Sequence, residues 1–199
     1  MRAVMPEVSP AILAWRKRTG ADRWDEMWEG VLHMAPSPNR EHQDLEWAME
    51  TYLRLRWARP RRARVYHQIN LTPPGGWPDN YRIPDLVLLS PGRFDIDRNE
   101  YFEGAPDVVV EIRSPGDESY EKLEFYATLG VPEVWIIHRD SKEPEIHSLQ
   151  AGRYERRAAG QDGWVLSPVT DLELRMGKPG KLAIRLAGDD NTREDLPEE

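Results

Sequence analysis

The chain has 199 residues, of which 39% are hydrophobic and 31% are charged. A chain of this length typically forms one domain, and its apolar fraction is sufficient for one core, which excludes wholesale disorder. No stretch approaches the roughly 18 consecutive apolar residues of a membrane span, and residues 1–18 lack the apolar run of a signal peptide. We therefore expect a cytoplasmic protein without a membrane partner. The absence of cysteine excludes disulfides, thiolate zinc sites and cysteine nucleophiles.

The net charge of −8 is unevenly distributed along the chain. Residues 189–199 contain six acidic residues and one arginine, and we expect them to form a disordered tail after a single domain over residues 1–188. Six arginines fall within residues 54–64, a local source of positive potential that a phosphate backbone could bind. The alternative is a solvated helix end with a basic loop. The candidate nucleic-acid contacts in this cluster are Arg59, Arg61 and Arg62.

The first elements along the chain are helical. Ser9 can cap a helix that has Pro10 in its first turn and covers residues 11–19, with Gly20 closing it. A short strand is expected over residues 31–35. Apolar residues then recur at intervals of three and four, which predicts a long amphipathic helix that ends at Pro60.

Strands dominate the second half of the chain. Alternating apolar residues predict a strand over residues 65–71. A helix over residues 118–129, closed by Gly130, separates two apolar runs and gives a strand–helix–strand unit. The apolar runs that read as central strands cover residues 83–89, 108–112 and 134–137. Shorter strands are expected over residues 145–149, 154–157 and 182–186.

Two acidic residues interrupt the apolar strands. Asp85 follows Ile83-Pro84, and Glu111 follows three valines in the next strand. A carboxylate in a central strand is costly to desolvate unless it is paired or bound to a cation. If the two strands are neighbours, the carboxylates form an oxygen site that suits Mg²⁺ or Mn²⁺. Taken singly, each acid can equally be a strand-end residue that faces water or an arginine.

The order of these motifs resembles a known nuclease family. Pro84-Asp85 followed by Glu111-Ile112-Arg113 is similar to the PD-(D/E)XK nuclease superfamily, with arginine in place of the usual lysine. More closely, the chain resembles the Uma-two family of restriction-endonuclease-like proteins over roughly residues 25–154. The segments that carry this resemblance are PSPNREHQ at 36–43, PDLV at 84–87, DVVVE at 107–111, SP at 114–115, EKLEFY at 121–126 and GVPEVW at 130–135.

The resemblance implies an α/β fold of the restriction-endonuclease type, with a mixed central β-sheet flanked by helices. It further implies that Asp85 and Glu111 hold Mg²⁺ together with the carbonyl of Ile112. Arg113 stays protonated and cannot be a general base, but it can bind phosphate. The catalytic lysine role then passes to Lys122, which near a desolvated site could lose a proton. The alternative for Lys122 is an exposed pair with Glu118.

Two further residues are candidates through the same resemblance. His42 could ligate a metal, bind phosphate or hydrogen-bond within the core. Glu26 could complete the metal shell, with Glu29 as its local rival. Asp107 lies on the same strand and face as Glu111, so it is not expected to supply the second strand's carboxylate.

We therefore expect a Mg²⁺-dependent endonuclease that hydrolyses DNA, with RNA as the other substrate to consider. The competing hypothesis is a catalytically weak or inactive nuclease fold that acts as a nucleic-acid-binding or assembly module. Arg113 favours this second hypothesis, whereas the joint presence of Asp85, Glu111 and Lys122 favours the first. Eight tryptophans in a small acidic chain favour a homodimer or a higher homo-oligomer.

Overall fold

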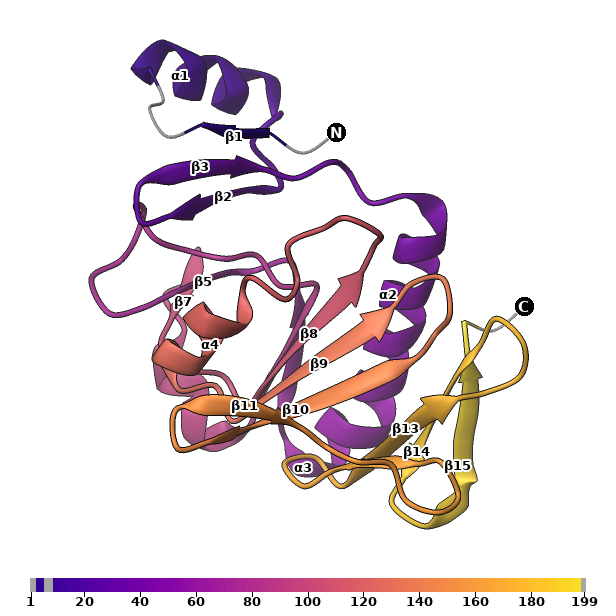
Figure 1. The fold of residues 1–199 in the computed structure, drawn as a ribbon. Helices are drawn as coiled ribbons and strands as arrows, with labels where there is room; N and C mark the ends of the chain where they lie inside the picture. Colours follow the sequence, from indigo (N-terminus) through magenta and orange to yellow (C-terminus); the bar gives the residue numbers. More distant parts are fainter. Residues whose placement is uncertain (1–2, 6–8, 198–199) are drawn as a thin grey trace.

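The computed structural model describes residues 3–5 and 9–197 (Figure 1). Within these residues the central feature is a mixed sheet of six strands in the order β11-β10-β9-β8-β6-β4. β8 and β9 pair in parallel, and the other neighbours are antiparallel. This confirms the predicted α/β class. The strands are β4 (Arg64–His67), β6 (Leu86–Leu89), β8 (Val108–Arg113), β9 (Glu133–His138), β10 (Pro144–Gln150) and β11 (Arg153–Arg156).

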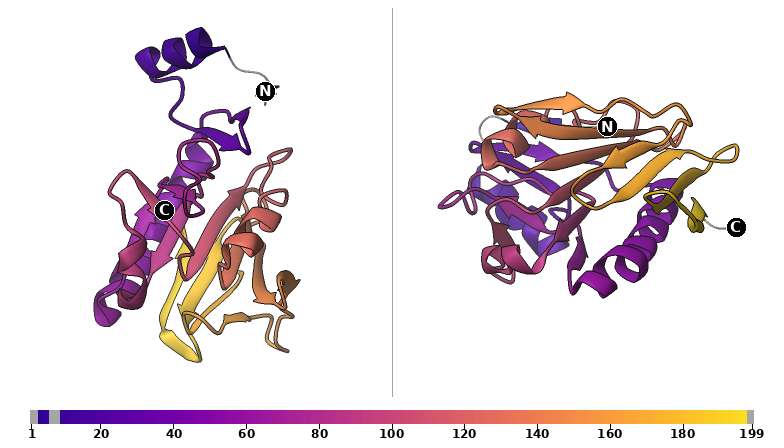
Figure 2. Two further views of the ribbon diagram at one scale, coloured as in Figure 1. Left: turned by 90° about the vertical axis from the view of Figure 1, so that its left-hand side faces the viewer. Right: turned by 90° about the horizontal axis from the view of Figure 1, so that it is seen from below.

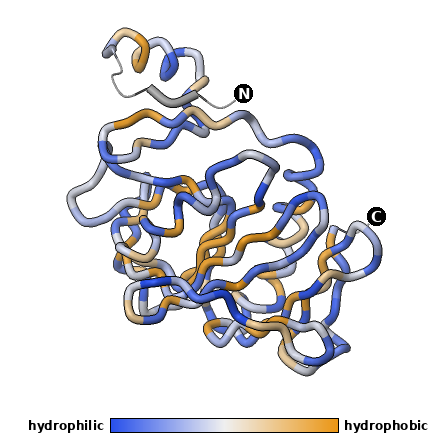
Figure 3. Tube along the Cα trace, in the orientation of Figure 1, coloured by the Kyte–Doolittle hydropathy of each residue, from blue (hydrophilic) through white to orange (hydrophobic). Residues whose placement is uncertain are grey.

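The central strands are apolar on both faces because both faces are covered. Val108 and Val110 of β8 belong to one buried cluster and Val109 to another, as expected from strand alternation. Figure 3 shows hydrophobic residues concentrated in these strands and hydrophilic residues in the connections around them.

One face of the sheet packs against α2 (Arg40–Tyr52), which Asn39 caps by accepting a hydrogen bond from the His42 amide. The helix continues as a π-helical segment, η1 (Leu53–Ala58), and a last turn, α3 (Arg59–Arg61). The helix extends one residue beyond the predicted end at Pro60, to Arg61, because a proline is tolerated in the first turn of a helical segment. The chain leaves the helix at Arg62, which has a left-handed backbone.

The other face packs against α4 (Leu123–Leu129), η2 (Pro91–Ile96) and a separate parallel pair, β5 (Asn70–Thr72) with β7 (Tyr101–Glu103). The strand predicted over residues 65–71 is therefore two strands of different sheets. Gln68 divides them with a φ of 48°. The helix predicted over residues 118–129 begins only at Leu123, and turns precede it.

The N-terminal segment forms its own small sheet. It comprises β1 (Ala3–Met5), β2 (Asp25–Trp28) and β3 (Val31–Met34), in the order β1-β3-β2, with α1 (Pro10–Thr19) between the first two strands. Ser9 caps α1 and Gly20 closes it with a φ of 69°, as predicted. Figure 2 shows α1 standing away from the central sheet.

The C-terminal segment corrects the prediction of a disordered tail over residues 189–199. It forms an antiparallel sheet of β12 (Val165–Ser167), β13 (Leu172–Met176), β14 (Leu182–Leu186) and β15 (Asp189–Leu196). Basic partners compensate its acids, since Arg185 donates to Asp190 and Arg56 donates to Glu194. The sheet packs with α2 on the same face of the central sheet, as Figure 2 also shows. Residues 198–199 lie outside the described residues.

None of the helices in the described part of the chain is long and apolar enough to cross a membrane.

Candidate active site

Asp85 and Glu111 lie on neighbouring strands, as the sequence analysis required. Asp85 directly precedes β6, and Leu86 of β6 pairs with Val110 of β8, so the antiparallel register places Asp85 beside Glu111. One Asp85 carboxylate oxygen accepts a hydrogen bond of 2.5 Å from the Ile112 amide. The two carboxylates are therefore held at the same end of the central sheet.

Lys122 reaches these carboxylates from the turn before α4. Its Nζ lies 2.8 Å from Glu26 Oε1 and 3.2 Å from Glu111. The Tyr126 hydroxyl, one helical turn further on, donates a 2.5 Å hydrogen bond to Glu111 Oε1. Tyr126 was not predicted as a site residue, although its spacing of four from Lys122 places both on one side of a helical turn.

The charge balance around Lys122 differs from the sequence expectation. Burial alone would lower the pKa of Lys122, but Glu111 and Glu26 outweigh burial and raise it. This arrangement of charges favours the protonated form of Lys122, in contrast to the expectation that it could lose a proton. Burial also raises the pKa of Glu111, against the effect of Lys122, and the nearby carboxylate of Asp85 raises it further.

Glu26 of β2 reaches the site, whereas its local rival does not. Glu26 Oε1 accepts a hydrogen bond from the Ile83 amide at 2.8 Å in addition to its ion pair with Lys122, and Oε2 accepts from Trp28 Nε1 at 2.8 Å. The Glu29 side chain is 68% exposed and lies 3.6 Å from Arg82. Glu26 thus ties the N-terminal hairpin to Lys122.

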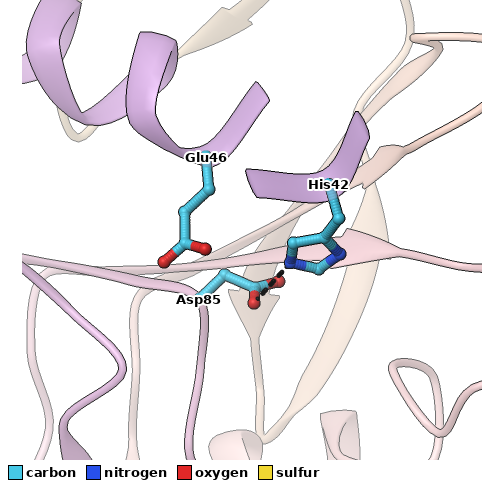
Figure 4. Close-up of side chains that lie close together, drawn as sticks. All are labelled: His42, Glu46 and Asp85. Carbon is cyan, nitrogen blue, oxygen red and sulfur yellow. Dashed lines mark hydrogen bonds and ion pairs between the residues drawn. The ribbon is translucent and has the colours of Figure 1, made fainter. Parts of the chain in front are cut away.

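His42 and Glu46 approach Asp85 from the first turns of α2 (Figure 4). His42 Nε2 lies 2.9 Å from Asp85 Oδ1, and one ligand atom from each of the three residues lies within 4.8 Å of the other two. Burial lowers the pKa of His42, but the charge and hydrogen bond of Asp85 outweigh it and raise that pKa. Burial raises the pKa of Glu46 to about 7.

Sequence reasoning missed Glu46. Its spacing of four residues from His42 places both side chains on one helix face, and that face also carries the buried Leu45 and Met49. A glutamate within the apolar face of a helix is the signal that could have identified it, because burying an unpaired carboxylate is costly.

Five of the predicted site residues line one cavity of about 430 Å³. Its lining includes Asp85, Glu111, Lys122, Glu26 and His42. The cavity therefore brings together all five residues predicted for catalysis or metal binding.

The arginines predicted to bind nucleic acid lie elsewhere. The Arg113 guanidinium lies 5.0 Å from the centre of the Tyr120 ring, and within the described chain its Nε has no hydrogen-bond partner. Among the described residues, the arginine that lines the cavity is Arg139, which donates to Ser114 Oγ at 3.2 Å. Sequence reasoning missed Arg139, which follows the end of β9 beside the end of β8.

The cluster of Arg59, Arg61 and Arg62 lies at the opposite end of the long helix from His42 (Figure 1). At 1.5 Å per residue this separation is on the order of 25 Å. Asp107, as expected, does not join the site: it accepts hydrogen bonds from the Ser90 amide and the Arg93 guanidinium.

The donor set fits a divalent cation. Carboxylate oxygens are preferred ligands of Mg²⁺ and Mn²⁺, and the site concentrates carboxylates against fewer cationic groups. Among the described residues, the acids are Glu26, Glu46, Asp85 and Glu111, and the balancing groups are Lys122 and His42. Burial raises the pKa of Glu111, and the carboxylates of Asp85 and Glu26 raise it further. A further positive charge would relieve this like-charge repulsion.

Comparison with known proteins identifies the family of the chain that carries this site. A sequence model of the Uma2 family, described as "Putative restriction endonuclease", matches residues 12–179. The chain belongs to the Uma2 family. This confirms the predicted resemblance and supports a nuclease. Asp85, Glu111 and Lys122 all lie within the matched region.

Solved structures agree at the level of the fold. The chain is similar to a crystal structure titled as that of a putative nuclease belonging to DUF820 from Anabaena variabilis ATCC 29413. The TM-score is 0.58 and the identity is 21%, over 72% of this chain and 81% of that chain. At this identity the likeness establishes a shared fold. None of the curated proteins compared with the chain matches it.

Proposed function

We propose that this Uma2-family protein is a divalent-metal-dependent endonuclease that hydrolyses phosphodiester bonds of DNA. The observation that carries the proposal is the convergence of Asp85, Glu111 and Lys122 in one cavity, from two paired strands and the turn before α4. Family membership supports the reaction class, and the excess of carboxylates supports the metal dependence.

In this proposal Asp85 and Glu111 hold Mg²⁺ or Mn²⁺ with the carbonyl of Ile112. The ion, when bound, supplies Lewis-acid stabilisation of the negative charge that develops on the phosphate. His42 orients Asp85 through its 2.9 Å contact, and Tyr126 orients Glu111 through its hydroxyl. Glu46 lies beside Asp85 and His42 as an additional oxygen donor.

Lys122 acts as a fixed positive charge. Because its carboxylate neighbours raise its pKa, it remains protonated and can bind a phosphate oxygen as charge accumulates there. Glu26, whose two oxygens already accept hydrogen bonds from Ile83 and Trp28, is then a positioning residue for Lys122. In the overall reaction a water oxygen bonds to phosphorus, one P–O bond breaks, and the leaving oxygen takes up a proton.

Metal binding is tested by thermal unfolding with and without millimolar Mn²⁺ or Mg²⁺. A ligand that binds the native state stabilises it by mass action and so raises Tm. The gain in the free energy of unfolding is about 2.7 kcal/mol when the ligand concentration is a hundred times Kd. We expect a rise in Tm for the wild type and for the control Asp107→Asn, and none for Asp85→Asn. Equal shifts in all three proteins would contradict the metal site.

Cleavage of labelled DNA in the same buffers tests the reaction. We expect metal-dependent strand cleavage that Asp85→Asn abolishes. A second candidate, an inactive nuclease fold that binds nucleic acid, is favoured by Arg113 in place of the usual lysine. Metal-dependent stabilisation and DNA binding without cleavage would support this second candidate.

A further inference from the structure

The reacting groups of the proposed nuclease lie deep in the cavity. The side chains of Glu111, Lys122 and Asp85 are only 5%, 12% and 15% exposed. A phosphodiester must therefore enter the cavity to contact them.

Two walls of the cavity come from separate segments. One consists of Trp24, the β2–β3 hairpin that follows it and the segment after the hairpin, with His33 and Pro36 in the lining, and the other is the loop over residues 114–119. His33 Nδ1 lies 3.0 Å from a Glu118 carboxylate oxygen, so a side-chain contact joins the two walls. The Met27 carbonyl accepts hydrogen bonds from the Tyr81 amide and from Arg82, at 2.7 and 3.1 Å, which anchors the hairpin to the body.

The cavity has the size of a small-molecule site and not of a duplex groove. Its volume of about 430 Å³ falls at the lower end of ligand pockets, which span about 300–1,000 Å³. Double-stranded DNA is stiff over about 150 base pairs, so one phosphate of an intact duplex cannot bend into such a recess. Enzymes that must bring a nucleotide out of the duplex into a closed pocket act on single strands or extrude that nucleotide, and we apply the same reasoning to this recess.

The walls also offer the groups that bind an unpaired nucleotide. Trp24 contributes an aromatic ring to the lining. The Arg23 guanidinium lies over this ring, 5.1 Å from its centre, so a base would stack on the opposite face, a contact that tolerates any sequence because every base has a π-face. Within the described chain, the Trp24 indole N–H has no hydrogen-bond partner. Arg139 lies in the same lining and can pair with a neighbouring phosphate.

We propose that the cavity accepts an unpaired strand of nucleic acid, with one base stacked on Trp24, and excludes base-paired duplex. This inference rests on the proposed nuclease function and names its substrate class. Trp24 is then the residue that determines specificity for an unpaired strand. The base stacked on it has no Watson–Crick partner inside the cavity.

Binding tests this inference independently of cleavage. The Asp85→Asn protein is titrated, with Mg²⁺ present, into a fluorescent single-stranded DNA oligonucleotide and into the same oligonucleotide annealed to its complement. We expect at least about tenfold tighter binding of the single strand. Adding Trp24→Ala should weaken single-strand binding by about fivefold or more, as expected for the loss of one base–aromatic stack.

The controls separate stacking from folding. Trp47→Ala removes a tryptophan that is 69% exposed on α2 and should leave binding unchanged, while Trp24→Phe should keep most of the affinity. Equal affinity for the two DNAs, no measurable binding, or equal losses in Trp24→Ala and Trp47→Ala would overturn the inference.

Cleavage mapping by the wild type then separates the inference from the proposed function. With a DNA that carries a duplex segment and an unpaired tail, we expect cuts confined to the tail. Cuts of equal rate inside the duplex would overturn the inference and leave the nuclease function standing. Trp24-dependent single-strand binding without any cleavage would overturn the nuclease function and support the binding inference.

Discussion

Lys122 joins three segments that are distant in sequence, because it pairs with Glu26 of the N-terminal hairpin and with Glu111 of β8. Removing its ammonium leaves two buried carboxylates facing each other without their cation. Breaking a buried ion pair in this way typically costs about 3–5 kcal/mol. The lysine therefore contributes both to stability and to the proposed chemistry.

These two contributions can be separated by a pair of variants. Lys122→Met should lower Tm and abolish metal-dependent cleavage. Adding Glu26→Gln removes the unpaired carboxylate, so the double variant should recover much of the lost Tm but none of the cleavage. Arg113→Lys, which changes a residue outside the cavity lining, should retain both. Cleavage by Lys122→Met at the wild-type rate would contradict the role of Lys122.

At the residue scale, the strand-borne acids were predictable and their helical partners were less so. Asp85 and Glu111 are conspicuous because a carboxylate interrupts an apolar run. Glu46 carries a weaker signal, its place on the apolar face of a helix, and Arg139 carries none, since arginines in turns are common on solvated surfaces. The pKa direction of Lys122 depends on Glu26 and Glu111 together, and the sequence does not show that both converge on one ammonium.

At the scale of elements, the long helix connects two functional predictions. Its first turns supply His42 to the cavity and Glu46 beside Asp85, and its last turn carries Arg59 and Arg61 on the order of 25 Å away. A nucleic acid that contacts both ends of this helix must therefore be several nucleotides long. A short strand bound in the cavity cannot contact the arginines.

This separation gives the arginine cluster a specific test. Replacing Arg59, Arg61 and Arg62 with glutamine should weaken binding of a long single-stranded DNA and reduce its salt slope by up to about 2, because each phosphate contact contributes about 0.7 for single strands. Binding of a tetranucleotide should not change. As a control, Arg153→Gln alters an exposed arginine of β11. An unchanged salt slope for the long DNA would identify the cluster as a solvated surface.

Elements with strong periodicity were predicted well, and those that depend on distant pairing were not. The central strands and α1 follow from local pattern and capping. The division at Gln68 depends on β5 pairing with β7, some thirty residues further along the chain. The sequence of β15 is acidic and typical of a disordered segment, yet β14 and the side chains of Arg185 and Arg56 pair with it.

The predicted homo-oligomer stays a prediction. The exposed Ile12, Leu13 and Trp15 of α1 are where a partner surface would be sought.

At the scale of the whole molecule, a buried carboxylate joins the central sheet to the C-terminal sheet. Glu133 of β9 is fully buried. It accepts hydrogen bonds from Ser167 at 2.5 Å, from Trp135 at 3.2 Å and from Ser148 at 3.3 Å. Ser167 belongs to β12, so this contact links the two sheets through one side chain.

Burial raises the pKa of Glu133 above its ordinary value of 4.5, although its three hydrogen-bond donors act in the opposite direction. Because the folded state holds this proton more tightly than the unfolded state, the contribution of Glu133 to stability is complete below pH 4.5 and is lost as pH rises through the raised pKa. Glu133→Gln cannot ionise. Its free energy of unfolding should therefore fall less than that of the wild type between pH 5 and pH 8. The free energy of unfolding of the variant relative to that of the wild type should thus be highest at pH 8.

Urea unfolding at several pH values between about 5 and 8 measures this difference directly. The matched control is Glu155→Gln, which changes an exposed glutamate of β11 in the same sheet and should follow the pH dependence of the wild type. If Glu133→Gln instead loses stability with pH as steeply as the wild type does, then Glu133 is ionised throughout this range. The serine and tryptophan donors would in that case compensate its burial in full, and the junction between the two sheets would be held by a buried charge.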